Sequence, residues 1–152
     1  MRAGDDITIV GISNMVVECL RAQELVAEIG ISAEVIDLIS LVPLDMETII
    51  ASTRRTGRLL VVDNAWTRAG ASAEIVAAVA ERLSAQHRIQ VSRMGFAPTP
   101  CPTTSALEKA FYPSPATIAV RVHQMVRHDA PEWEPDAEKA ALTYQRAFRG
   151  PF

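Results

Sequence analysis

The sequence has few of the features that would place it in a specialised structural class. It holds only two cysteines among 152 residues, and Cys19 and Cys101 lie too far apart to form a CxxC metal-ligand pair or a disulfide framework. No segment approaches the ~18 consecutive apolar residues of a membrane-spanning helix. The N-terminus also lacks the cationic start and apolar stretch of a signal peptide. We therefore expect a cytoplasmic domain whose core is held by apolar burial.

Positive charge is in short supply as well. The chain has 15 Lys and Arg against 18 Asp and Glu, which gives a formal net charge of -3. Binding to nucleic acid or to an anionic membrane relies on an excess of cations that neutralise phosphates. The composition therefore argues against a nucleic-acid partner and against a membrane partner.

The motifs of nucleotide binding and nucleophilic catalysis are missing. The turn after the first apolar segment has one glycine, Gly11, whereas a dinucleotide-binding turn needs several so that its backbone can approach a pyrophosphate. There is no P-loop, and no serine has the flanking glycines of a nucleophile elbow. The histidines His87, His123 and His128 have no partner at metal-ligand spacing and are predicted to lie at the solvated surface. We expect no catalytic, cofactor-binding or metal-binding residue in this chain.

Four short, β-branched, largely apolar segments are typical of strands that are covered on both faces. They span residues 7–12, 33–39, 58–63 and 88–94. The stretches between them have a period near 3.6, so strands and helices alternate along the chain. This order predicts an α/β fold, a three-layer α/β/α domain with a mostly parallel sheet of about four to five strands.

Helix boundaries are marked by capping residues and glycines. The pattern predicts helices over residues 14–29, from 43 to just before Gly57, from 72 to 83, over 105–111, and from 115 to 126. Ser13 or Asn14 is expected to cap the first of these, and Gly30 to end it. Ser114 followed by Pro115 is a standard start for the last one.

The composition changes beyond the last core helix. We expect a domain over residues 5–127, then an acidic, proline-containing linker over 128–136 that leads away from it. Residues 137–149 regain helical spacing, with Tyr144 and Phe148 on its apolar side. A helix this short is marginal alone, so we expect it to dock on another surface.

The loop after the third strand is the most suggestive segment. It follows the carboxyl end of a central strand, where ligands bind in open α/β sheets, and it carries Asn64, Trp66 and Arg68. Tryptophan and arginine are both enriched in protein interfaces. An interface is therefore favoured over an active site, with Tyr144 and Phe148 as further candidate contact residues.

Several segments, in order, match a known family. They are residues 6–10 (DITIV), 31–38 (ISAEVIDL), 41–45 (LVPLD), 56–63 (TGRLLVVD), 70–75 (GASAEI), 98–102 (PTPCP) and 106–110 (ALEKA). From residue 5 to about 126 the chain resembles the C-terminal domain of transketolase-like thiamine diphosphate enzymes. It is most similar to the beta subunit of the decarboxylating component of 2-oxo acid dehydrogenase complexes.

The resemblance implies a fold, partners and a cofactor. In the beta subunit this domain follows a pyrimidine-binding domain, carries subunit contacts and helps to grip the acyltransferase core. Thiamine diphosphate and its magnesium ion are held by the other two domains. The present sequence departs from the family in the loop after the third strand, where many relatives have more glycine and an acidic residue at the position of Asn64 or Ala65.

Two functions remain open from the sequence. The first is a subunit-interaction domain of a thiamine diphosphate-dependent 2-oxo acid dehydrogenase or a transketolase-like enzyme, forming a homodimer and inactive alone. The alternative is a free-standing binding or regulatory module that kept the fold without the enzyme. A small nucleotide-binding enzyme is a weaker third reading, because of the single-glycine turn at Gly11.

Overall fold

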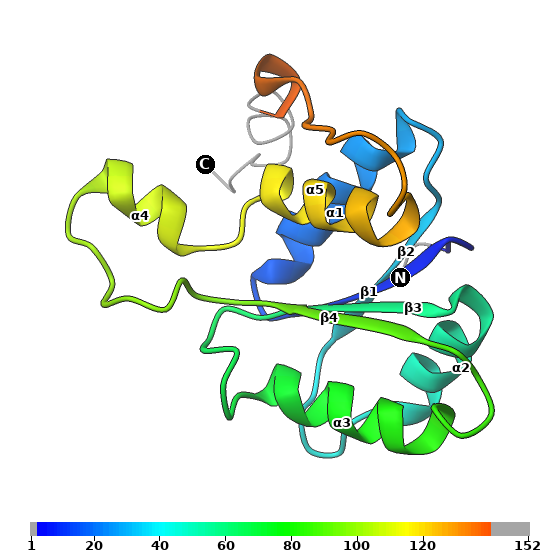
Figure 1. Cartoon of the computed structure of the whole chain (residues 1–152). Helices are drawn as coiled ribbons and strands as arrows, with labels where there is room; N and C mark the ends of the chain where they lie inside the picture. Colours follow the sequence, from blue (N-terminus) through cyan, green and yellow to red (C-terminus); the bar gives the residue numbers. More distant parts are fainter. Residues whose placement is uncertain (1–2, 141–152) are drawn as a thin grey trace, which may run out of the picture.

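The computed structural model describes residues 3–140, in which strands and helices alternate (Figure 1). The strands are β1 (Ile7–Ile12), β2 (Ala33–Leu38), β3 (Arg58–Val62) and β4 (Gln90–Met94). The helices are α1 (Met15–Ala27), α2 (Met46–Thr56), α3 (Ala71–Leu83), α4 (Ser105–Phe111) and α5 (Pro115–Val126). Over this part of the chain, no helix is long and apolar enough to cross a membrane.

The four strands form one parallel sheet in the order β2-β1-β3-β4. Helices α1 and α5 cover one face of the sheet, and α2 and α3 cover the other, while α4 stands away from the sheet (Figure 1). The predicted α/β architecture with a parallel sheet of about four strands is therefore confirmed.

The core divides into two layers because successive strand residues point to opposite faces. Ile7, Ile9 and Leu60 pack with α1 and α5. Val10 and Leu59 pack with α2 and α3. Every residue of β1 is buried, as expected for a central strand with helices on both sides.

Local chemistry fixes most helix ends as the sequence predicts. Gly30 and Gly57 have left-handed backbone angles, with φ of 76° and 69°, which glycine adopts without steric cost. Ser114 accepts a hydrogen bond from the backbone of Thr117 at 3.2 Å and begins α5. Helix α2 starts at Met46 rather than at Pro43, because Asp45 accepts the backbone N–H of Thr48 at 3.1 Å.

The predicted cap of the first helix is wrong. Neither Ser13 nor Asn14 makes a side-chain capping hydrogen bond to α1. Ser13 instead has a left-handed φ of 58°, and its backbone carbonyl accepts the N–H of Val16 at 3.2 Å. Backbone groups thus close the turn after β1.

The acidic segment after α5 does not lead away from the domain. Trp133 packs against the core on the α1/α5 face and lies on the ring of His123, with centroids 5.3 Å apart. His123 is only 5% exposed, so its predicted place at the solvated surface is wrong. The physical reason is the large apolar area of the Trp133 indole, which overrides the polar composition around it.

The residues after this segment begin a helix. Residues 137–140 are helical, and Lys139 Nζ lies 2.7 Å from Glu28 Oε2 just beyond α1. Most of the predicted docking helix, including Tyr144 and Phe148, lies outside the described residues.

Candidate functional site

The carboxyl ends of the parallel strands meet at one edge of the sheet, where ligands and partners bind in this class of fold. Four connections emerge there: the turn after β1, the loop after β2, the loop over residues 63–70 after β3 and the segment that starts at Gly95 after β4. Since β1 lies between β2 and β3, the turn into α1 lies between the loops that follow those two strands.

Asp63, the first residue after β3, fixes the start of the loop over residues 63–70. Its side chain is buried, and its carboxylate accepts backbone hydrogen bonds from Asn64 and from Ser72 in the first turn of α3. The N-cap residue of α3, Gly70, has no side chain that could make this bond. Asp63 therefore caps α3 from the strand, and its burial raises the pKa of its carboxyl group.

Close backbone contacts hold the same loop in one conformation. A Cβ at Gly70 would overlap the carbonyl oxygen of Trp66, and a Cβ at Gly95 would overlap that of Ala65. Phe96 donates its backbone N–H to the Ala65 carbonyl at 2.9 Å, and Arg93 donates to the carbonyl of Thr67. The loop is therefore ordered before any partner binds, which lowers the entropic cost of binding.

The loop displays Trp66 at the surface while holding its ring in place. The Trp66 indole meets Phe96 edge-to-face, with centroids 6.2 Å apart, and Phe96 stacks on Phe111 at 4.7 Å. Trp66 nevertheless remains 50% exposed. A fixed, half-exposed aromatic ring is typical of the anchor residues of protein interfaces.

The other two predicted contact residues lie on the same loop in different settings. Arg68 is exposed, whereas Asn64 is half-buried. The Oδ1 atom of Asn64 is buried and has no hydrogen-bond partner within residues 3–140. The structure thus brings Asn64, Trp66 and Arg68 together, and their role as contact residues stays a prediction.

Exposed aliphatic residues extend this surface, and sequence reasoning missed them. In the loop after β2, Ile39 and Val42 are each 91% exposed and Leu41 is 48% exposed. Val17, in the first turn of α1, is 43% exposed. The run Ile39-Ser40-Leu41-Val42 resembles the end of a strand, and only its position beyond the sheet shows that it is exposed. We name Val17, Ile39, Leu41, Val42, Trp66 and Arg68 together the carboxyl-edge surface.

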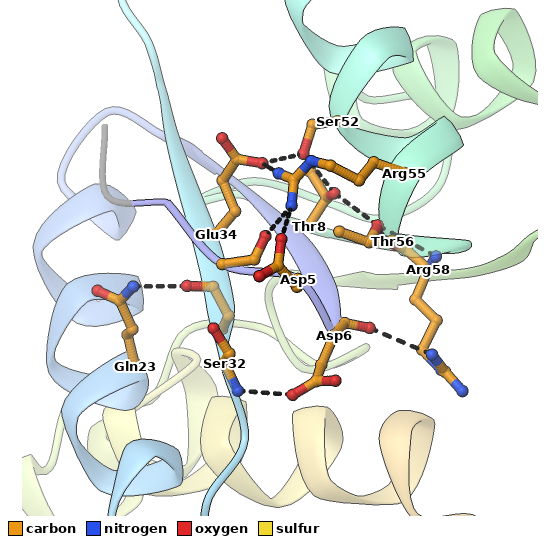
Figure 2. Close-up of polar contacts among 12 residues, drawn as sticks. Asp5, Asp6, Thr8, Gln23, Ser32, Glu34, Ser52, Arg55, Thr56 and Arg58 are labelled. Atoms are coloured by element: carbon orange, nitrogen blue, oxygen red, sulfur yellow. Dashed lines mark hydrogen bonds and ion pairs between the residues drawn. The ribbon is translucent and has the colours of Figure 1, made fainter.

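The opposite, amino edge of the sheet is closed by polar contacts (Figure 2). The carboxylate of Glu34 on β2 binds the guanidinium of Arg55 and the hydroxyl of Ser52, both on α2. The buried hydroxyl of Thr8 lies 2.6 Å from that of Ser52 and 2.8 Å from that of Thr56. A network of this kind satisfies polar groups that would be costly to bury alone.

Further contacts tie the start of β1 into the same network. Arg55 also donates to the Asp5 carboxylate and to the Gly4 carbonyl (Figure 2). Arg58 donates to the Asp6 carbonyl at 3.2 Å and to the Met125 carbonyl at 2.9 Å. These groups bind one another, so their evident role is to fix the first residues of the domain against β2 and α2.

The side chains of residues 3–140 form no site that fits thiamine diphosphate or its magnesium ion. Across residues 3–140 no three His, Cys, Asp or Glu side chains come together to hold a metal. The turn after β1 is filled, because a Cβ at Gly11 would lie 2.8 Å from Cα of Val16. We therefore assign no step of catalysis by this cofactor to residues of this chain.

The two cysteines lie in different surroundings. Cys19 is buried in α1, and burial raises the pKa of its thiol well above the usual range, which keeps it protonated. Cys101 is exposed, and its sulfur lies 3.9 Å from the hydroxyl oxygen of Tyr112.

Comparison with known families agrees with this fold and with the matching segments of the sequence. The family model "Transketolase, C-terminal domain" matches residues 1–118. The chain belongs to the transketolase C-terminal domain family. The resemblance drawn from the sequence is confirmed, and this transketolase C-terminal domain continues past the matched residues into Trp133 and the helical turn at 137–140.

Individual relatives agree with the family assignment. The domain is 45% identical over 112 residues to pyruvate dehydrogenase E1 component subunit beta-1 of Arabidopsis thaliana, a match over 74% of this chain and 31% of that protein. It is 36% identical over 127 residues to the acetoin:2,6-dichlorophenolindophenol oxidoreductase subunit beta of Cupriavidus necator, a match over 84% of this chain and 38% of the relative.

A solved structure shows the same fold. The split gene transketolase described as an inactive beta4 tetramer has a TM-score of 0.71 and 28% identity, covering 82% of this chain and 40% of that one. The chain therefore spans about a third of the length of the curated relatives that it matches.

Proposed function

We propose that this chain is the subunit-interaction domain of a thiamine diphosphate-dependent enzyme of the 2-oxo acid dehydrogenase or transketolase type. In this proposal the carboxyl-edge surface docks on another domain or subunit of the enzyme. The other domains hold the cofactor and carry out the chemistry. The chain alone is inactive.

One observation carries the proposal: a preordered loop presents Trp66 at the same edge of the sheet as several aliphatic side chains that a lone domain leaves in water. Val42 and Ile39 are each 91% exposed, and Trp66 is half-exposed on its pinned loop. Contiguous exposed apolar patches mark interaction sites, whereas scattered single residues do not. Arg68 on the same loop adds a cation that can pair with an acidic group of the partner.

The proposal includes the assembly and the location. We propose a homodimer of the parent enzyme's beta-type chains, with the acyltransferase core as a further partner in a dehydrogenase complex. The relatives include both mitochondrial and bacterial proteins, and a cytoplasmic location belongs to the proposal for this chain.

The test measures binding of this chain to the remaining domains of its parent enzyme, produced separately. Trp66→Ala should weaken binding by roughly 30-fold or more, because hot-spot truncations cost at least ~2 kcal/mol. Ile39→Ser should weaken it by roughly tenfold through loss of buried apolar area. Isothermal titration calorimetry gives the dissociation constants.

A matched control comes from an exposed apolar residue nearer the other end of the sheet. Val91, near the start of β4, is 38% exposed, and Val91→Ser should leave the dissociation constant unchanged. Equal affinities for the wild type and for Trp66→Ala would contradict the proposed docking surface.

A free-standing binding module is the second candidate function. The observation that favours it is that the chain's own helices cover both faces of the sheet, so the domain closes its core without a partner (Figure 1). Adding the chain to a parent enzyme that lacks its C-terminal domain separates the two functions. Restored turnover supports the enzyme domain, and a folded chain that restores none supports the free-standing module.

A further inference from the structure

A groove runs along one side of α5 and reaches the carboxyl end of β4. It encloses about 480 Å³ between α5, Met94 at the end of β4, and the segment over residues 134–140. Its lining includes Met94, Ala116, Val120, Pro135, Ala137 and Ala140. Small and apolar side chains therefore make up most of its walls, with Thr117, Arg121, Gln124 and Glu134 among its polar lining.

The chain itself forms one wall of this groove and then continues beyond it. After α5 the segment turns back along the helix (Figure 1), held by Trp133 on His123 and by Lys139 on Glu28. A helix then begins at residue 137. The Asp136 carboxylate accepts the backbone N–H of Lys139 at 2.9 Å, and the Asp136 backbone carbonyl accepts that of Ala140 at 2.9 Å. Twelve residues, 141–152, follow this start.

Ala137 and Ala140 show which face of this helix is turned to the groove, and helical periodicity then gives the later residues on the same face. Ala137 and Ala140 line the groove, whereas Lys139 pairs with Glu28. In an α-helix residues i, i+3, i+4, i+7 and i+11 share one face. Counted from Ala137, these positions are Ala140, Ala141, Tyr144 and Phe148, while Leu142 and Arg146 fall on the opposite side.

We propose that residues 141–149 extend this helix and seat Tyr144 and Phe148 in the groove beside α5 and β4. The occupant is the chain's own C-terminal segment. Tyr144 falls one helical turn past Ala140, ~6 Å along the axis. The segment covers the side of α5 that lines the groove. It adds a docked helix beyond the residues that the family model matches.

The first test compares substitutions on the two sides of the segment in the full chain. Tyr144→Ser with Phe148→Ser should raise amide hydrogen exchange roughly tenfold in β4 and in the first turns of α5, and should lower Tm by roughly 5 °C. Leu142→Ser, on the side away from the groove, should change neither. Equal effects of the two sets of substitutions would overturn the proposal.

A second test identifies whose segment fills the groove. Tyr144→Cys with Ala116→Cys, in a Cys101→Ser background, is treated with a short bismaleimide and analysed by denaturing electrophoresis and intact mass. A cross-linked monomer supports docking within one chain. A covalent dimer would mean that the segment seats on a second copy, and no cross-link would mean that it does not occupy the groove; either result overturns the proposal.

Discussion

The two edges of the sheet differ in how their polar and apolar groups are covered. At the amino edge the buried carboxylate of Glu34 has the Arg55 guanidinium and the Ser52 hydroxyl against it. At the carboxyl edge the buried carboxylate of Asp63 is bound by backbone N–H groups, and the surrounding loops leave aliphatic side chains in water. The amino edge is complete within one chain, whereas the carboxyl edge has apolar surface that a partner can cover.

This difference separates stability from recognition. Substitutions in the amino-edge network should lower the stability of the domain without changing what it binds. Substitutions on the carboxyl-edge surface should change binding and leave the fold largely intact, since exposed side chains contribute little to stability.

Breaking the amino-edge network should produce the largest effect on stability. Arg55→Met leaves the Glu34 carboxylate, whose side chain is only 10% exposed, without its cation. We expect a loss of about 2–3 kcal/mol, below the usual cost of a fully buried pair because Arg55 itself is partly exposed. Urea denaturation measures this loss. The neighbouring exposed Arg54→Met should cost less than ~0.5 kcal/mol, and equal losses at the two positions would refute the comparison.

The carboxyl edge should respond to pH through Asp63. Its pKa is raised by burial, so the folded chain holds this proton to higher pH than the unfolded chain does. The resulting stabilisation is fully present below the unfolded pKa of ~3.9 and is lost as pH rises through the raised folded pKa. Asp63→Asn removes this titration and keeps an acceptor for the Ser72 N–H.

The measurement is the free energy of unfolding of the wild type and each variant from pH 2.5 to pH 7. Relative to the wild type, Asp63→Asn should gain stability as pH rises. For Asp45→Asn we expect a pH dependence of the opposite sign. Hydrogen bonds from Thr48 lower the pKa of Asp45, so the contribution of Asp45 to stability is lost as pH falls through that lowered pKa. A difference for Asp63→Asn that does not vary with pH would contradict the assignment.

The smallest expected effect concerns the cofactor of the parent enzyme. Saturating thiamine diphosphate and magnesium should shift the Tm of the isolated chain by less than ~1 °C, because a ligand stabilises only a fold that binds it. Differential scanning fluorimetry checks this. A clear shift would place a cofactor site in this chain and remove the basis of the proposed function.

The sequence alone predicts the regular elements well because their signals are local. Strand β1 matches its predicted bounds, and Gly30 and Gly57 follow their helices as expected, each with a left-handed φ. The loop bearing Trp66 and Arg68 was also recognised, since it follows a strand and combines residue types that interfaces favour.

Contacts between distant residues could not be predicted in this way. Nothing in the spacing of Thr8, Glu34 and Arg55 indicates that they meet, because the sheet order brings them together only after β1 pairs with β2 and α2 packs on both. The burial of His123 depends in the same way on Trp133, which lies in a segment of polar composition. The capping role of Asp63 was missed because the loop over residues 63–70 separates this residue from the start of α3, the helix that it caps.

The strand order also sets a constraint on biosynthesis. Strand β1 is translated first but lies in the middle of the sheet, and its second neighbour, β3, ends only at Val62. Ribosomes add residues at roughly 5–20 per second, so a strand that is fully buried in the folded domain stays without one of its partners for several seconds. During that interval the elements that can cover β1 are those translated before β3, namely α1, β2 and α2.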